Sequence, residues 1–227
     1  MLNLPPAQLM QTDAAFASLK AFGNSLKPSD ASDAKDNWFF QIIFELIDTT
    51  LTNYDHLKIG YSSNDDHLLA WACRNLLELT VFAKYVLISE DNARRFAQDR
   101  LIDGCDIIRS LKALELHANP QSDNALLDDA LTRMQAQMAS EGITLQKYLS
   151  TSVLAGHVGM KEEYDCMNRV CSKLVHPTAW SILAVNSGEN VFTQARPLLF
   201  TMGAGYGCDL FCSIRDHHAV YGIKPKR

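Results

Sequence analysis

The sequence predicts an all-α protein, a single up-and-down helical bundle of about seven helices spanning residues 1–227. Apolar residues recur with helical spacing in nearly every segment, which is the main sequence signal for amphipathic helices. The chain has only 11 glycines and 7 prolines, fewer than a turn-rich β-sandwich or barrel uses. No internal repeat, low-complexity run or long linker divides it. One mostly helical domain is therefore the simplest interpretation.

Two helices are expected in the first quarter of the chain. The first covers about residues 6–22 and ends near a Gly-Asn pair. A loop rich in helix-capping residues follows, and the second helix covers about residues 33–58. A turn over residues 60–66 offers Ser and Asp caps for the next element. The second helix carries an apolar stripe with i, i+3, i+4, i+7 spacing, formed by Phe39, Ile42, Ile43, Leu46 and Leu51.

The third expected helix, residues 65–88, is apolar on nearly all sides, which is typical of a helix at the centre of a bundle. It carries two charges in its middle, Arg74 and Glu78, at i and i+4. A charged helix ending near residue 116 comes next, followed by a polar amphipathic helix over residues 122–139. These two are expected at the surface.

The rest of the chain is less regular. Residues 143–160 have a short helical pattern near 145–148 and then two glycines. A helix is expected over residues 161–176, where a proline follows, and residues 178–185 can continue it after a bend. After a polar loop, the last helix covers about residues 191–218.

Composition and charge narrow the class of protein. The apolar share of 47% and charged share of 21% exclude a disordered chain. A formal net charge of −5 argues against broad coating of nucleic acid but allows a local basic site. The first residues have neither a basic nor an apolar signal region, and the six cysteines are sparse, so we expect a cytoplasmic protein with reduced thiols. No stretch of about 18 apolar residues occurs; the closest, residues 197–208, is uncharged but only 12 residues long, too short to cross a membrane.

The strongest local pattern lies on the expected helix 161–176. Arg169, Lys173 and His176 stand at i, i+4 and i+7, so they share one helical face. Ser172 and Asn168 lie beside them. Arg and Lys supply fixed positive charge and His a group that can titrate near neutral pH, a combination suited to an anion site. The alternative is a solvated basic face whose cations stabilise the end of a helix.

The spacing of Arg169 and His176, with Pro177 after them, resembles the R-x4-6-H motif of HEPN domains. These are helical bundles, and many are metal-independent ribonucleases of prokaryotic defence and toxin-antitoxin systems. The helix with Arg74 and Glu78 is similar to the R-x-L-x-E … Y helix of HEPN-like families of unknown function, with Tyr85 at the tyrosine position. The two matches span a core of about residues 65–180, with the flanking helices 6–58 and 191–218 expected to pack on it.

The resemblance implies an RNA endonuclease that needs no cofactor or metal. Arg169 would hold the phosphate and stabilise developing charge, and His176 would act as general base or acid. It also implies a homodimer that brings two such motifs together. A partner protein from the same operon is a separate expectation. The alternative is a non-catalytic interaction or ligand-binding module with the same fold. The net negative charge and an apolar residue, Val170, directly after the motif arginine favour that alternative.

The charged pair inside the apolar helix has two interpretations. Arg74 and Glu78 can form an ion pair that also bonds a neighbouring helix, because charges taken from water need partners. Alternatively, Glu78 orients Arg169 or His176. In either case we expect the pair to face the bundle interior and to contact helix 161–176, with Tyr85 and Tyr164 hydrogen-bonding in the same region. No C-x2-C or E-x-x-H pattern occurs, so no metal site is predicted.

Overall fold

The computed structural model describes residues 4–26, 37–119, 124–144, 149–176, 178, 191–222 and 224. In these residues every regular element is a helix, so the predicted all-α class is confirmed. The described part holds eight helices where the sequence predicts about seven. They are α1 (Pro6–Ser25), α2 (Asn37–Ser63), α3 (Asp66–Val86), α4 (Glu90–Ala118), α5 (Ala125–Ser140), α6 (Thr151–His157), α7 (Lys161–Val175) and α9 (Val191–Tyr221).

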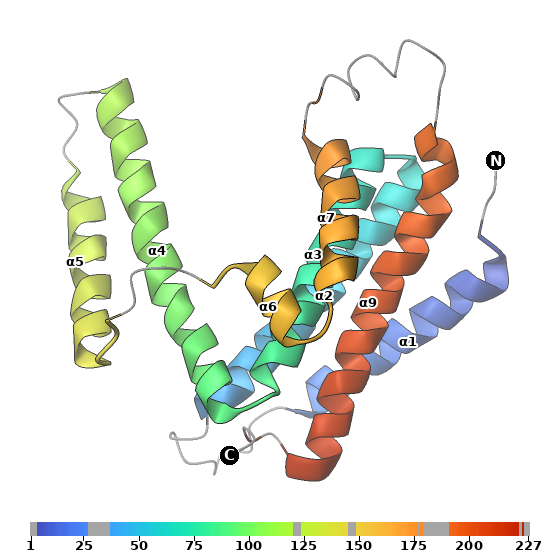
Figure 1. Ribbon diagram of the computed structural model, residues 1–227, viewed down its shortest axis with the longest axis horizontal. Helices are drawn as coiled ribbons and strands as arrows, with labels where there is room; N and C mark the ends of the chain where they lie inside the picture. Colours follow the sequence, from blue (N-terminus) through green and yellow to red (C-terminus); the bar gives the residue numbers. More distant parts are fainter. Residues whose placement is uncertain are drawn as a thin grey trace.

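Helix α3 is the centre of the structure, as its apolar sequence predicts. It packs against α2, α7 and α9 (Figure 1), and Leu69, Leu76 and Val81 on it are completely buried. Asp65 caps its first turn by accepting a hydrogen bond of 2.9 Å from the Leu68 N–H, which satisfies one of the free donors at a helix start. We refer to α1, α2, α3, α7 and α9 as the body.

Small residues let α9 lie close to its neighbours. A Cβ atom at Gly203 would stand 2.9 Å from Leu57 Cδ1 and 3.2 Å from the Cα of Cys73, so a larger residue there would force the helices apart. Gly203 therefore serves the close packing of α9 against α2 and α3.

Helices α4 and α5 form a hairpin that diverges from the body, which we call the arm (Figure 1). They pack on each other, and α4 meets α3 near its own beginning. Ser89 caps α4 by accepting a hydrogen bond from the Asn92 N–H. Helix α5 has no buried residue, and among the described helices it packs on α4.

Several expected boundaries are wrong. Helix α2 ends at Ser63 instead of near residue 58, because Gly60 stays helical where α2 crosses the backbone of Leu69. The turn to α3 is consequently short, and Asn64 adopts a left-handed φ of 59°, which asparagine tolerates. Helix α6 was not predicted, whereas the expected pattern at 145–148 and the extension over 179–185 lie outside the described residues. In the described part, no helix is long and apolar enough to span a membrane.

Candidate functional site

Helix α7 carries the sequence motif and has two distinct sides. Its inner side is formed by Tyr164, Met167, Cys171 and Leu174, all of which are buried. Their spacing of three and four residues is that of a helix lying on a core, and the core in this case is α3 and α6. The helix ends at Val175, one residue earlier than predicted.

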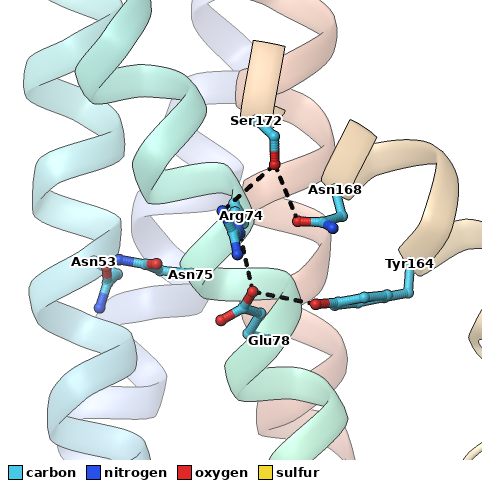
Figure 2. Close-up of polar contacts among 7 residues, drawn as sticks. All are labelled: Asn53, Arg74, Asn75, Glu78, Tyr164, Asn168 and Ser172. Carbon is cyan, nitrogen blue, oxygen red and sulfur yellow. Dashed lines mark hydrogen bonds and ion pairs between the residues drawn. The ribbon is translucent and has the colours of Figure 1, made fainter. Parts of the chain in front are cut away.

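At the edge between α7 and α3, five side chains form a continuous polar chain (Figure 2). Arg74 Nε donates to Glu78 Oε1 at 3.0 Å, and Arg74 Nη1 donates to Ser172 Oγ at 3.5 Å. Ser172 in turn donates to Asn168 Oδ1 at 3.4 Å, while the Tyr164 hydroxyl donates to Glu78 Oε1 at 3.4 Å. The contact between the charged pair and α7 is therefore present as expected.

The same pair is partly buried, but it does not face the bundle interior. The side chains of Arg74 and Glu78 keep 30% and 22% of their exposure, so they stand at the edge of the helix interface and not in the interior. Water reaches both groups, and this reduces the free-energy cost of holding two charges there. Burial and the negative charge of Glu78 raise the pKa of the Tyr164 hydroxyl, so Tyr164 acts as a hydrogen-bond donor to that carboxylate.

Two asparagines fix α3 on its opposite side, and sequence reasoning missed them. Asn75 Nδ2 donates to Asn53 Oδ1 of α2 at 2.9 Å (Figure 2), and Asn53 is only 5% exposed. A polar residue on the buried side of α2 is the signal that could have identified this contact. With α2 on one side and α7 on the other, the segment of α3 around Arg74 is held by polar bonds in two directions.

The outer side of α7 holds the predicted basic residues. Arg169, Lys173 and His176 are all exposed, and none forms a hydrogen bond through its side chain or an ion pair with another described residue. By contrast, eleven other Lys and Arg side chains of the described part are in ion pairs. His176 is the C-cap: its backbone is extended, and its N–H donates to the Ser172 carbonyl at 3.0 Å.

The predicted site residues do not all come together. Glu78 contacts Arg74 and Tyr164 and makes no contact of hydrogen-bonding or ion-pair type with Arg169 or His176, so the interpretation in which it orients the motif pair finds no support. Tyr85 is eleven residues, or roughly 16 Å, farther along α3 than Arg74. It is buried beside the ring of His157, and burial raises the pKa of its hydroxyl.

A pair of buried thiols lies beneath the polar chain and was not singled out from the sequence. Cys73 precedes Arg74, Cys171 precedes Ser172, and both thiols are fully buried and free. Hydrogen bonding to Cys171 and burial raise the pKa of the Cys73 thiol well above its ordinary value, so this thiol stays protonated. Among the described residues, no three His, Cys, Asp or Glu side chains gather as a metal site.

Comparison with known proteins identifies no relative of this chain. No protein-family model matches the chain, and neither the curated proteins nor the solved structures include a significant match. The chemistry of the exposed and half-buried groups on α7 and α3 is thus the basis for a functional proposal.

Proposed function

We propose that this protein is an HEPN-like RNA-binding protein that cleaves single-stranded RNA without a metal ion through Arg169 and His176. The observation that carries the proposal is the outer side of α7. Arg169, Lys173 and His176 are exposed there and unpaired among the described residues, at spacings that align them on one helical face. An unpaired cation is ready to contact a phosphate without first losing an ion pair.

The polar chain at the inner edge of α7 supports the same proposal. Arg74 and Tyr164 are tied to Glu78, and Ser172 joins Arg74 to Asn168. These bonds hold α7 in one orientation on α3, so the outer side chains project from a fixed base. A site built on a helix whose packing is fixed keeps its groups in position better than a site on a loop.

The proposed chemistry is attack by a ribose 2′-hydroxyl on the adjacent phosphorus. The His176 imidazole accepts the 2′-hydroxyl proton while that oxygen bonds to phosphorus, and the bond to the 5′-oxygen breaks. The products are a 2′,3′-cyclic phosphate and a 5′-hydroxyl, whose proton comes from a second acid. Arg169 stabilises the negative charge that develops on the phosphate oxygens.

A second copy of the chain would supply that acid. Arg169 and His176 are two helical turns apart, or about 10 Å along the axis, and they stand on the convex outer side of a helix. Two α7 helices facing each other across a two-fold axis would bring a second His176 to the same phosphate. We therefore propose a homodimer as the active form.

The test is a cleavage assay on several single-stranded RNAs in EDTA. Wild-type protein should cut, and Arg169→Ala or His176→Ala should each lower the rate by about 10²–10⁴-fold. Two matched controls should leave the rate unchanged: Lys20→Ala removes an exposed cation from α1, and Val170→Ala trims an exposed residue of α7 next to the motif. Circular dichroism verifies that each variant is folded.

Binding is measured separately from cleavage. Arg169→Ala and Lys173→Ala should weaken RNA binding and each lower the slope of log affinity against log salt by about one, and Lys20→Ala should not. The proposal is contradicted if the wild-type protein cleaves none of the RNAs and its RNA affinity is unchanged by these substitutions. Cleavage that requires a divalent metal and survives His176→Ala contradicts it as well.

A further inference from the structure

A groove of about 1250 Å³ lies where the arm joins the body, away from the outer side of α7. It runs between α4 on one side and α2, α3 and the start of α6 on the other. Neither Arg169 nor His176 lines it. Its apolar floor consists of half-buried side chains from four segments of the chain, namely Trp38, Ile42, Leu79, Phe82, Phe96 and Leu149.

Aromatic rings make up part of the floor. The rings of Phe82 and Phe96 lie 5.3 Å apart between centroids, and the guanidinium of Arg94 stands 4.6 Å from the centre of the Trp38 ring. The groove is larger than the roughly 300–1,000 Å³ of ordinary small-molecule pockets. Its size therefore favours a peptide segment over a metabolite.

One wall of the groove follows α4, and beyond the groove the same face of α4 becomes an apolar stripe. Starting from Phe96 in the groove, the same helical face carries Arg100 and Asp103 and then reaches Ile107, Leu111 and Leu114. The last three are 60%, 48% and 66% exposed. From Phe96 to Leu114 the face extends about 27 Å. Spacings of three and four residues are those with which one helix packs along another.

The rim of the groove is acidic. Glu45, Asp103 and Glu141 line it, and none of them forms an ion pair with a cation of the described residues. Arg100 is the one cation of the described lining that lacks an ion pair there. The carboxylates without a cationic partner thus outnumber the free cations.

The other charges of the lining already have partners. Asp99 accepts bonds from Arg95 at 3.0 Å and from the Leu149 N–H at 2.8 Å, and Arg94 is paired with Glu90. They add no net charge for an incoming ligand to neutralise. The free charge of the described rim is negative.

We infer that this groove binds an amphipathic α-helix of a partner protein, with an apolar stripe that covers the floor and the α4 stripe and with Lys or Arg on its flanks. The aromatic floor and the three exposed α4 residues supply the apolar surface for such a helix-in-groove contact. The unpaired carboxylates supply charge complementarity. This inference is independent of the proposed RNA chemistry, which uses a different side of the molecule.

The raised pKa of Asp103 is consistent with a ligand helix that carries Lys or Arg on its flanks. Loss of hydration beside the groove, together with the charges of Asp99 and Asp106, raises the pKa of Asp103. A cation placed at the rim relieves this repulsion, whereas an acidic helix increases it.

The test uses a synthetic 18-residue peptide of Leu and Lys with Leu at i, i+3, i+4 and i+7. One control peptide replaces Lys with Glu, and a second keeps the composition but scrambles the spacing. Isothermal titration calorimetry with the full chain should show at least tenfold tighter binding of the Leu/Lys peptide than of either control. No binding of the Leu/Lys peptide, or equal binding of the three, overturns the inference.

Matched variants locate the binding surface. Glu45→Gln, Asp103→Asn and Glu141→Gln together should weaken binding of the Leu/Lys peptide at least tenfold, as should Ile107→Ser with Leu111→Ser. The control, Asp55→Asn with Asp129→Asn and Glu162→Gln, makes the same change of charge at three exposed carboxylates outside the groove lining and should change affinity less than twofold. Equal losses in the two triple variants would indicate general charge attraction and overturn the inference.

Two further outcomes separate this site from alternatives. Arg169→Ala should leave peptide affinity unchanged, so a failed RNA assay does not affect this result. Analytical ultracentrifugation tests whether a second copy fills the groove. A concentration-dependent dimer that Ile107→Ser with Leu111→Ser dissociates would identify the occupant as another copy of this chain and overturn the proposal of a foreign helix.

Discussion

Helix α3 and the distal half of α4 have similar apolar spacing and opposite surroundings. Leu76 of α3 is completely buried, whereas Leu114 of α4 is 66% exposed. The body covers α3 with α2, α7 and α9, whereas in the described part of the chain α4 packs mainly on α5 and meets α3 to a smaller extent. Periodicity therefore identifies the face of a helix that is suited to burial and does not identify what covers it.

The largest expected effect compares these two leucines. Leu76→Ala should lower the free energy of unfolding by about 2–5 kcal/mol, because it removes buried atoms and leaves a cavity. Leu114→Ala should cost less than about 0.5 kcal/mol, since its side chain stays largely in water. Both are in helix interiors, so helix propensity changes equally in the two variants. Urea unfolding followed by circular dichroism measures the difference.

If Leu114→Ala lowers the free energy of unfolding as much as Leu76→Ala does, the comparison is wrong. Such a result would mean that the α4 stripe is covered in solution. Repeating the measurement over a hundredfold range of protein concentration distinguishes the two sources of cover. A concentration-dependent midpoint points to a second copy, and a constant midpoint points to a segment of the same chain.

Two glycines of α9 make a sharper contrast inside the body. A Cβ at Gly207 would lie 2.4 Å from Cζ of Phe16, whose ring is stacked on Tyr54 at 3.5 Å and has little room to move. Gly207→Ala should therefore cost about 1–3 kcal/mol. A Cβ at Gly205 meets nothing within 4 Å, so Gly205→Ala should stabilise the helix by about 0.4–1 kcal/mol.

Thermal unfolding of the two variants tests this contrast directly. The melting temperature should fall in Gly207→Ala and rise in Gly205→Ala. A fall of the same size in both would show that α9 is sensitive to any added volume and that the close approach to Phe16 is not the cause.

Much of the fold follows from the sequence, and the parts that do not have physical reasons. The long helices are predicted because their apolar stripes extend over several turns. The short helix α6 is not, since its seven residues, one of them Gly156, give too few turns for a periodic signal. The apolar surroundings of Arg74 predict that its side chain is at least partly buried, as it is, but they do not distinguish a position at the edge of the interface from one inside it.

The candidate site shows the same limits. Spacing predicts that Arg169, Lys173 and His176 share a face, and the structure has all three on the exposed side of α7. Spacing along one helix carries no information on contacts between helices that are distant in sequence. Three features of the site depend on such contacts: the bond from Arg74 to Ser172, the Asn75–Asn53 contact and the pairing of Cys73 with Cys171. The separation of Tyr85 from the polar chain could not be predicted for the same reason.

Two ion pairs extend the comparison of body and arm to charges. Glu78→Ala should cost about 1–2 kcal/mol, because it leaves Arg74 and the Tyr164 hydroxyl without their shared acceptor at a half-buried site. Asp129→Ala breaks the exposed pair with Arg133 on α5 and should cost less than about 0.5 kcal/mol. Glu78→Gln keeps an acceptor oxygen and should recover part of the loss. Urea unfolding measures these free energies. If Glu78→Ala and Asp129→Ala lower the free energy of unfolding equally, the ion pair on α3 contributes no more than an exposed pair.

The smallest expected effect concerns the acidic rim beside the arm. The pKa of Asp103 is raised in the folded chain by loss of hydration and by Asp99 and Asp106. Folding therefore favours the protonated form, and stability falls as the pH rises through the unfolded-state pKa toward the folded-state pKa. Above both pKa values, Asp103→Asn should raise the free energy of unfolding by less than about 0.5 kcal/mol, because the side chain is exposed and its interactions are screened by water. At a pH below both values the Asp103 carboxyl of the wild type is protonated and therefore neutral, like the Asn side chain. The difference in the free energy of unfolding should then vanish. Urea unfolding at pH 7 and pH 3 measures both, and a variant that is less stable than wild type at pH 7 would mean that the Asp103 carboxylate has a cationic partner in solution.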